Sequence, residues 1–231
     1  MASDSTHNPK LSIIIPTWNE EGVIASTLAE LDMLKKHAVE IIVVDGGSSD
    51  RTVEIAKAIA DRVLIKPTGR AIQMNHGANM ARGKYLLFLH ADTRMPSNSF
   101  EILKRCFEQN CIWGRFDLRL SGRNRLFRIV EFCINLRSRL SGVATGDQAM
   151  FVNRAIFHDL GGFPEIAIME DIALSKKLRR LSPPVCLREK VITSSRRWEQ
   201  HGIGRTILLM WVLRLLYLFG VSPERLARWY R

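Results

Sequence analysis

The sequence has no apolar run long enough for a membrane-spanning helix. The final apolar stretch, 207–221 (ILLMWVLRLLYLFGV), has 15 residues with Arg214 among them, whereas a span needs about 20 apolar residues and a central arginine is costly there. Arginines flank the stretch on both sides, at Arg205, Arg225, Arg228 and Arg231. An amphipathic helix at a membrane interface fits this pattern, and so does a helix packed on the domain or in a dimer interface.

A secretory signal and a disulfide or zinc pattern are also missing. Residues 1–10 are polar and contain no apolar segment, which predicts that the first half of the chain stays in the cytoplasm. The four cysteines form no C-x-x-C pair, so we expect reduced thiols in a reducing compartment. The chain would then be cytoplasmic, and peripheral on the inner face of the membrane if its last helix binds lipid.

Two glycine-rich phosphate-binding motifs are absent. No G-x-G-x-x-G follows the first apolar run, and G-x-x-x-x-G-K-[ST] occurs nowhere, which weighs against dinucleotide-binding and P-loop proteins. Aromatic residues make up only 8% of the chain, and no helix-turn-helix, RNA-binding or zinc signature is visible. These absences weigh against nucleic acid as a partner.

Positive charge is what the chain has in excess. It carries 34 Lys+Arg against 23 Asp+Glu, a net charge of +11. Residues 1–100 hold 11 basic and 11 acidic side chains, whereas residues 101–231 hold 23 and 12. The whole excess therefore lies in the second part of the chain.

Arginine dominates one segment of that second part. Seven arginines and no lysine occur within 25 residues: Arg115, Arg119, Arg123, Arg125, Arg128, Arg137 and Arg139. The simplest interpretation is a solvated helix face. Since arginine binds phosphate in a bidentate manner, the series also favours an anionic partner, namely a phosphate-bearing acceptor, lipid headgroups or a second copy of the chain.

The first half alternates short apolar runs with segments of helical periodicity. We expect strands at 11–16, 40–45, 62–66 and 84–90, and helices at 20–36, 48–60 and 69–82. Nearly continuous apolar strands that alternate with helices predict a parallel sheet covered on both faces.

The second half is less regular. Its patterns predict helices at 97–108, 124–140, 153–160 and 170–181, with extended segments at 112–120, 149–152 and 185–193. The sequence thus predicts a Rossmann-like α/β domain over 11–204, with a mixed, mainly parallel sheet flanked by helices. A polar tail (1–10) precedes it and a C-terminal amphipathic helical segment (205–231) follows.

Acidic and polar residues mark the ends of three predicted strands. These ends read Pro16–Glu21 (PTWNEE), Asp45–Asp50 (DGGSSD) and His90–Asp92 (HAD). Ligands of open α/β sheets bind beyond the carboxyl ends of the strands. Glu20 and Asp45 can accept hydrogen bonds from a base or ribose, and Asp92 can hold a divalent metal on a diphosphate.

Together these motifs resemble family 2 glycosyltransferases with the GT-A fold. The run Gly69–Ala78 (GRAIQMNHGA) before F-L-H-A-D-T is similar to a subgroup of small single-domain bacterial members, some of them described as arsenosugar-biosynthesis-type glycosyltransferases. Three further motifs resemble the acceptor side of the family: Gly146-Asp147-Gln148, Met169-Glu170-Asp171 and Arg196-Arg197-Trp198. The resemblance covers about residues 11–200. It implies a nucleotide-sugar half (11–95) and an acceptor half (96–204).

The resemblance implies a role for each matching residue. In the nucleotide-sugar site, Asp45 would contact the base, Arg70 would lie near the base or phosphates, and Asp92 would coordinate Mg²⁺ or Mn²⁺. The other residues of that site would be Pro16, Trp18, Glu20, Gly46 and Ala91. Asp171 would be the general base. The acceptor and diphosphate side would comprise Gly146, Asp147, Gln148, Glu170, Arg197 and Trp198.

The implied reaction is the inverting transfer of one sugar from a nucleotide-diphosphate sugar, most often UDP-linked, to an acceptor hydroxyl or phosphate. The metal would neutralise the leaving diphosphate, so that one carboxylate suffices as base. His90 stands where the family has the first aspartate of D-x-D, so metal binding depends on Asp92, with His90 as a second candidate ligand. Ser194 replaces the glutamine of Q-x-x-R-W, which favours a non-processive enzyme. A lipid phosphate and a small polar metabolite both remain open as acceptors, as does a homodimer.

Two other classes compete with this hypothesis. A nucleotidyltransferase shares the α/β architecture, but a glycine-rich loop with a basic residue should follow its first strand, and Pro16–Glu21 contains neither feature. A non-enzymatic basic module that binds membranes or nucleic acid would explain the charge but not the acids at the strand ends.

Overall fold

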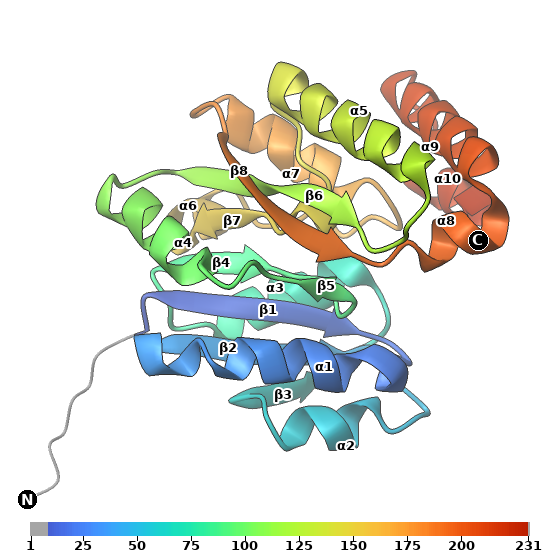
Figure 1. Cartoon of the computed structure of the whole chain (residues 1–231). Helices are drawn as coiled ribbons and strands as arrows, with labels where there is room; N and C mark the ends of the chain where they lie inside the picture. Colours follow the sequence, from blue (N-terminus) through green and yellow to red (C-terminus); the bar gives the residue numbers. More distant parts are fainter. Residues whose placement is uncertain (1–8, 231) are drawn as a thin grey trace, which may run out of the picture.

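The computed structural model describes residues 9–230, so most of the predicted polar tail and Arg231 lie outside the described residues. Its centre is an eight-stranded sheet of order β3-β2-β1-β4-β7-β6-β8-β5 (Figure 1). The first four strands in that order are parallel: β3 (Arg62–Ile65), β2 (Val39–Asp45), β1 (Leu11–Thr17) and β4 (Tyr85–Phe88).

Helices cover both faces of this parallel part, as the sequence predicts. Alternate side chains of a strand point to opposite faces, so Ile13 and Ile15 belong to one buried cluster and Ile14 to another. Helix α1 (Glu21–Asp32) and α2 (Thr52–Lys57) pack on the first face, and α3 (Arg70–Met80) packs on the second.

The second half extends the sheet with both strand directions. Strand β7 (Phe151–Asn153) runs antiparallel to β4 and to β6 (Trp113–Leu120), whereas β8 (Val185–Thr193) runs parallel to β6. The short β5 (Thr93–Arg94), absent from the sequence prediction, pairs antiparallel with β8. The remaining elements are α4 (Ser99–Glu108), α5 (Arg125–Ser141), α6 (Arg154–Asp159), α7 (Glu170–Arg179) and two short 3₁₀ turns, η1 (Lys35–His37) and η2 (Gly146–Gln148). The predicted α/β class with a mixed, mainly parallel sheet is confirmed.

Most of the arginine series is not a solvated face. Arg115 is fully buried and pairs with Asp117, to which Arg139 also donates at 2.7 Å. Arg128 lies 3.0 Å from Glu131 on the same helix. These pairs form because α5 packs along β6, which brings the arginines against carboxylates and backbone carbonyls. Only Arg119, Arg123 and Arg125 of the series are exposed.

The chain ends in three helices: α8 (Arg196–His201), α9 (Ile203–Leu218) and α10 (Pro223–Tyr230). Leu213 of α9 and Leu226 of α10 are fully buried, in a cluster with Val143, Met169 and Ile172. The packed alternative for the C-terminal stretch is therefore confirmed. None of the helices within residues 9–230 is long and apolar enough to cross a bilayer.

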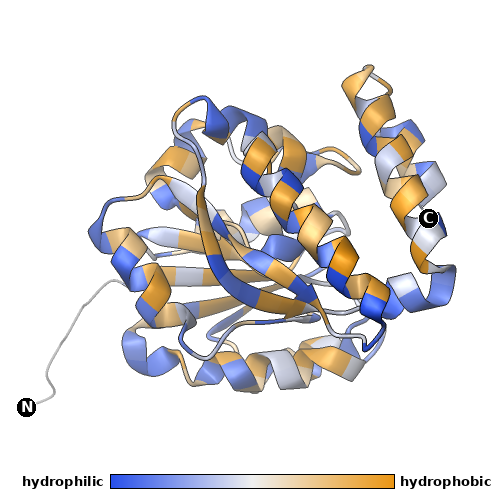
Figure 2. Cartoon of the chain, turned by 45° about the horizontal axis from the view of Figure 1, so that its top comes forward, coloured by the Kyte–Doolittle hydropathy of each residue, from blue (hydrophilic) through white to orange (hydrophobic). Residues whose placement is uncertain are grey.

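The opposite face of α9 is exposed and apolar. Trp211 and Phe219 are 71% and 79% exposed, and three leucines of the same face are more than half exposed: Leu208, Leu215 and Leu218. Figure 2 shows these apolar stretches on α9, with further apolar positions along the neighbouring α5. One face of the terminal helix thus packs on the domain while the other is unpartnered.

Candidate active site

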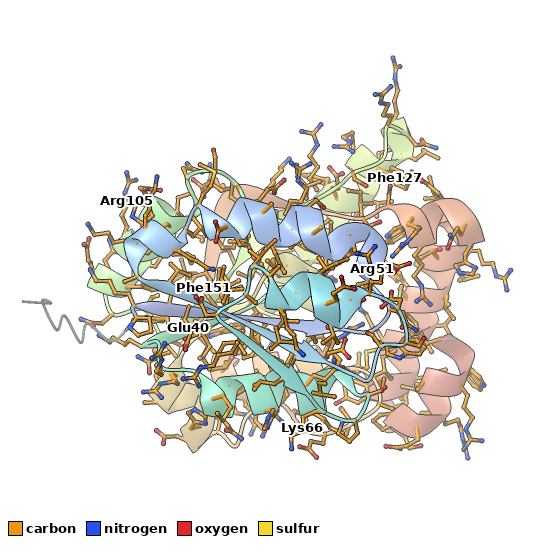
Figure 3. All side chains as sticks on the ribbon, turned by 90° about the horizontal axis from the view of Figure 1, so that it is seen from below. Glu40, Arg51, Lys66, Arg105, Phe127 and Phe151 are labelled. Carbon is orange, nitrogen blue, oxygen red and sulfur yellow. The ribbon has the colours of Figure 1, made fainter. Side chains whose placement is uncertain are left out.

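Three loops meet at the carboxyl edge of the parallel strands. The loops after β1 and β2 are adjacent because Thr17 and Asp45 are register partners, and the loop after β4 follows one strand further along the sheet. In Figure 3, Arg51 marks this edge, whereas Glu40 and Arg105 lie toward the opposite end. The marked strand ends of the sequence therefore do converge.

Asp45 is buried beneath the loop that it begins. Its carboxylate accepts hydrogen bonds from the backbone N–H of Gly47 (2.8 Å) and Ser48 (2.7 Å) and from the hydroxyls of Thr17 (3.0 Å) and Ser48 (2.6 Å). Ser48 is therefore part of this loop, and α2 begins only at Thr52, four residues after the start of the predicted helix 48–60. For Asp45 to contact a base, some of these bonds must be exchanged, and that role stays a prediction.

Gln73, on helix α3, holds together the ends of strands β1 and β2. Its side-chain amide donates to the carbonyls of Thr17 and Val44, both at 2.8 Å. Gly46 lies in the narrow space between them, where an added Cβ would come within 3.3 Å of Gln73, Thr17 and Thr68. Only glycine fits at position 46 without a shift of these neighbours.

The loop after β1 combines an open aromatic side chain with a half-buried carboxylate. Trp18 is 57% exposed, so its indole face is accessible to a planar ligand, and the half-buried Pro16 precedes it. Asn19 adopts a left-handed backbone (φ 53°) and binds Ser49 N–H through its side chain. Glu20 follows, with its backbone N–H bound by Thr52 at 2.7 Å.

Glu20 and Asp92 form an acidic pair next to Arg196. Burial and the charges of Asp92 and Asp50 raise the pKa of Glu20 above its usual range, although Arg196 opposes this shift. Burial likewise raises the pKa of Asp92, again against Arg196, and Asp147 adds to the rise. Arg196 lies 3.8 Å from Glu20. Asp92 thus lies near both Glu20, in the loop after β1, and Asp147, in the turn η2.

His90 is a neutral imidazole at this site. Burial, together with the nearby Arg70, lowers the pKa of His90 to about 3. Its Nε2 atom is buried and has no hydrogen-bond partner. Gly146 lies directly against it, because a Cβ at position 146 would approach His90 Nε2 to 2.7 Å. Ala91, also buried, turns its carbonyl toward Thr27.

Glu170 and Asp171 are the first two residues of helix α7, and Asp171 contacts Gly146. Asp171 accepts the backbone N–H of Gly146 at 2.8 Å and that of Ile172 at 2.7 Å. Glu170 is buried 3.5 Å from Arg70. Burial and Asp171 raise the pKa of Glu170, against Arg70. Burial lowers the pKa of Arg70, but nearby groups raise it by more, so that the net shift is upward. These groups are Glu170, Tyr230, Asp171 and Asp147.

The G-D-Q motif divides into two kinds of residue. Asp147 has a buried Oδ1 atom without a partner, whereas Gln148 is fully buried and caps the turn η2 through Thr145. Gln148 also bonds to Asn135 at 3.5 Å. The structure therefore brings Asp147 to the other site residues and turns Gln148 inward.

The R-R-W motif is divided in the same way. Arg196 lies near Glu20 and Asp92. Arg197 instead stacks 3.7 Å from the ring centre of Tyr230 and donates to its carbonyl. Trp198 packs half-buried against the main core cluster, so it fastens α8 to the domain.

The family model "Glycosyl transferase family 2" matches residues 12–160, well over half of the chain and all three strand ends. The chain belongs to glycosyl transferase family 2. Among curated relatives, the probable glycosyltransferase YdaM of Bacillus subtilis is 27% identical over 218 residues, which is 84% of this chain and 51% of YdaM. The chain thus spans about half the length of that relative.

Solved structures show the same GT-A fold. S. aureus TarS 1–349 in complex with UDP-GlcNAc has a TM-score of 0.66 at 21% identity, over 80% of this chain and 58% of TarS. Glucosyl-3-phosphoglycerate synthase from Mycobacterium tuberculosis, in complex with Mn²⁺, UDP and glucosyl-3-phosphoglycerate, has a TM-score of 0.60 at 19% identity, over 80% and 71%. This family 2 chain is therefore of GT-A type, with added C-terminal helices.

The residues of this site suit a divalent metal whose remaining ligands come from a bound diphosphate. No group of three or more acidic, cysteine or histidine side chains within residues 9–230 forms a metal cage. Asp92, however, is a carboxylate at the strand end, and His90 Nε2 is a buried, unpartnered and neutral nitrogen. Mg²⁺ and Mn²⁺ accept one or two protein ligands when substrate phosphates supply the others. The donor set suits a metal brought in with a diphosphate.

Several residues near the site are missing from the sequence prediction. Thr17, Ser48 and Gln73 position the donor loops, and all three lie within or next to motifs that were noticed. Arg137 of α5 and Tyr217 of α9 lie near Asp171, Arg214 of α9 lies near Arg137, and Tyr230 of α10 lies near Arg70. The sequence names Arg137 and Arg214 only as members of a basic series and of the final apolar stretch. No local pattern places these four residues at the site, because the long-range packing of α5, α9 and α10 brings them there.

Proposed function

We propose that the chain transfers one sugar from a nucleotide-diphosphate sugar to an acceptor hydroxyl or phosphate. The observation that carries this proposal is the single edge at which Asp92, Gly146 and Asp171 meet. Asp92 ends the nucleotide-sugar half, and Asp147 raises its pKa from the acceptor half, while Gly146 contacts both His90 and Asp171. A donor at the first three loops would lie next to the carboxylate that activates the acceptor.

The donor nucleotide has suitable partners in the first half. Trp18 is exposed for stacking on a base, and the glycines after β2 permit close approach of its ribose to the backbone. Arg196 and Arg70 supply positive charge on either side of Asp92 and His90. UDP is the first nucleotide to test, because TarS and the synthase above bind UDP or a UDP-sugar.

Asp92, with His90 beside it, is the proposed ligand of Mg²⁺ or Mn²⁺. When bound, the metal would neutralise charge on the departing diphosphate. The neutral state of His90 suits this role, since imidazole binds metals in its unprotonated form.

Asp171 is the proposed general base. In a single inverting displacement by an acceptor hydroxyl, the hydroxyl oxygen forms a bond to the anomeric carbon while the bond from that carbon to the diphosphate breaks, and the hydroxyl proton passes to Asp171. The bond from Gly146 N–H orients Asp171 Oδ2, and the remaining lone pairs of the carboxylate can accept the proton. One sugar per acceptor is expected, because Ser194 replaces the glutamine of the processive motif.

A thermal-shift screen tests the donor proposal. UDP, GDP, CDP and dTDP are added to the full chain with Mn²⁺ or with EDTA. We expect at least one nucleotide to raise the melting temperature in the presence of Mn²⁺ and to do so less with EDTA. Indifference to all four, combined with salt-sensitive binding to DNA or RNA, would contradict the proposal and favour the non-enzymatic module.

The exposed faces of α5 and α9 are the proposed contact with an anionic membrane surface. Ile129, Phe132 and Leu140 of α5 are 61%, 65% and 80% exposed and lie on one helix face, like the exposed side chains of α9. The surplus positive charge of the second half complements anionic lipid. The acceptor would then be reached at the bilayer surface.

Vesicle flotation tests this contact with the full chain. Trp211→Glu/Leu215→Glu should reduce flotation with phosphatidylglycerol vesicles at least tenfold, whereas the control Met33→Glu changes an equally exposed side chain at the far end of α1. Equal flotation of all three proteins would contradict the contact. Light scattering that shows a dimer in the parent chain, lost in the double variant alone, would assign the face to a second copy instead.

A further inference from the structure

Two arginines from different helices lie close together near Asp171, and neither has a counter-ion of its own: Arg137 is near Asp171, and Arg214 is near Arg137. Arg137 belongs to α5 and Arg214 to α9. The Nε and Nη2 atoms of Arg137 and the Nε atom of Arg214 are buried and have no hydrogen-bond partner. Within residues 9–230, no carboxylate forms an ion pair with either side chain. By contrast, the other buried arginine of this region, Arg115, pairs with Asp117.

The charges of these two arginines repel each other. Burial, followed by the neighbouring Arg214, lowers the pKa of Arg137 to about 10, although Asp147 and Asp171 act in the opposite direction. Two neighbouring like charges whose buried N–H groups have no partner are destabilising. Unpaired buried groups of this kind call for a partner, and a bound anion is the partner that two arginines would take.

The pair also has a defined place relative to the reaction. Arg137 is close enough to Asp147 and Asp171 for both to affect its pKa. Tyr217, three residues after Arg214 on α9, is close to Asp171 as well, since burial and Asp171 raise the pKa of Tyr217. Asp147 contributes a further buried oxygen without a partner. Arg137, Tyr217 and Asp147 therefore surround Asp171, and Asp147 also lies near Asp92.

We propose that Arg137 and Arg214 bind a phosphate group carried by the acceptor and thereby place the attacking oxygen of that acceptor at Asp171. This inference rests on the proposed glycosyl transfer and names its acceptor class as a phosphorylated molecule. Two guanidinium groups offer several N–H donors in planar arrays, which match the oxygen geometry of phosphate. The terminal helices α9 and α10 are then part of the site, because Arg214 reaches it only when Leu213 and Leu226 are packed.

Inorganic phosphate is the first probe. The chain is saturated with the nucleoside diphosphate and Mn²⁺ found in the thermal-shift screen, so that the donor diphosphate site is filled, and phosphate is titrated by calorimetry. We expect phosphate binding in the parent chain and binding at least tenfold weaker in Arg137→Gln and Arg214→Gln. Arg205→Gln, which alters an exposed arginine of the same helix, should bind phosphate like the parent.

The stability of the same variants separates an anion site from a structural role. Without phosphate, Arg137→Gln should unfold at the same temperature as the parent or higher, since the substitution removes an unpaired charge. Arg137→Lys should restore part of the phosphate binding. A variant that melts lower yet binds phosphate as the parent does would overturn the proposal. So would a parent chain that binds no phosphate at 10 mM, which is roughly ten times the Kd of a millimolar site.

The source of the phosphate is distinguished with two further probes. Glycerol 3-phosphate represents a soluble phosphate ester, and phosphatidic acid in phosphatidylcholine vesicles represents a lipid one. A response of the parent but not of Arg214→Gln to either probe supports the site and assigns its source, and a response to neither overturns it. Nucleotide binding is measured in parallel, so failure of the donor proposal would appear as a parent chain that binds no nucleotide.

Discussion

The donor loops and the acceptor side of this site differ in how their buried polar groups are satisfied. On the donor side, Asp45 accepts four hydrogen bonds from its own loop and from Thr17, and both side-chain N–H groups of Gln73 are bound to carbonyls. On the proposed acceptor side, several buried atoms have no partner, namely Asp147 Oδ1, Arg137 Nε and Nη2, and Arg214 Nε, and so does His90 Nε2, against which Gly146 lies.

This difference suits the two proposed roles. Hydrogen bonds among their own residues and from Thr17 and Gln73 hold the proposed donor loops in one shape before a ligand binds, and a contact between Asp45 and a base would exchange some of them. The proposed acceptor side keeps unpaired groups, and because buried polar groups in proteins are otherwise nearly always paired, these atoms are where the proposed metal, phosphate or acceptor would bind. Substitutions on the two sides should therefore have opposite signatures.

The largest effect is expected for Asp171→Asn. The amide keeps the size of the side chain and an oxygen for Gly146 N–H, but it cannot accept a proton, so the turnover rate should fall about 10²–10⁴-fold while nucleotide affinity is unchanged. Turnover is measured as release of nucleoside diphosphate in the presence of acceptor. Asp159→Asn, at an exposed position of α6, serves as the control, and normal turnover by Asp171→Asn would remove this residue from its role.

Asp92→Asn should weaken the binding of nucleotide in the presence of Mn²⁺. Loss of the carboxylate weakens the metal site, so nucleotide affinity measured by calorimetry with Mn²⁺ should drop by about 10–100-fold, a typical range for altered metal-site residues. With EDTA in place of Mn²⁺ the variant and the parent should differ little. An unchanged affinity in Mn²⁺ would show that the metal, if needed, is held elsewhere.

A matched pair of substitutions tests the difference between the two sides directly. Asp45→Asn removes one acceptor oxygen and leaves buried loop donors unpaired, which should lower the free energy of unfolding by about 1–3 kcal/mol. Asp147→Asn changes a side chain whose Oδ1 has no partner, so its effect should stay within about 0.5 kcal/mol. Urea unfolding of both variants gives the comparison, and equal losses would refute the contrast between the two sides.

The smallest effect is a pH dependence of stability at Asp92. The native pKa of Asp92 lies above its usual value because of burial, so the native state binds the proton more readily than the unfolded state and loses stability as the pH rises from the ordinary carboxyl range. Without metal, Asp92→Asn should therefore melt a few degrees higher than the parent at pH 8 and equally at low pH. Melting curves in EDTA across this range test the sign.

The alternating first half was predictable because its signals are local. Apolar runs such as Leu11–Pro16 and Lys84–His90 lie within a residue or two of the observed strands β1 and β4, and helix α3 lies within the predicted 69–82. The convergence of the three marked strand ends followed from the parallel order of the strands. Helix starts were less accurate: the helix predicted from residue 48 begins at Thr52, because Ser48 is held in the preceding loop by its bond to Asp45.

The acceptor side was predictable only in part. The motifs containing Asp147 and Asp171 identified the region, but not that Gln148 and Trp198 point inward. The solvated-face interpretation of the arginine series was wrong for Arg115, since its partner Asp117 and the packing of α5 on β6 are tertiary features. The approach of Arg214 to Arg137 joins residues 77 positions apart, and no periodicity in the sequence encodes it.

Release of nucleoside diphosphate from nucleotide sugars tests the central claim most directly. The full chain is incubated with UDP-, GDP-, CDP- and dTDP-sugars, a phosphorylated acceptor mixture and Mn²⁺, and the products are separated by chromatography. The account predicts that at least one donor is cleaved to its nucleoside diphosphate, that EDTA slows the cleavage, and that Asp171→Asn abolishes it. Intact donors throughout, or cleavage that is equally fast in Asp171→Asn, would contradict it.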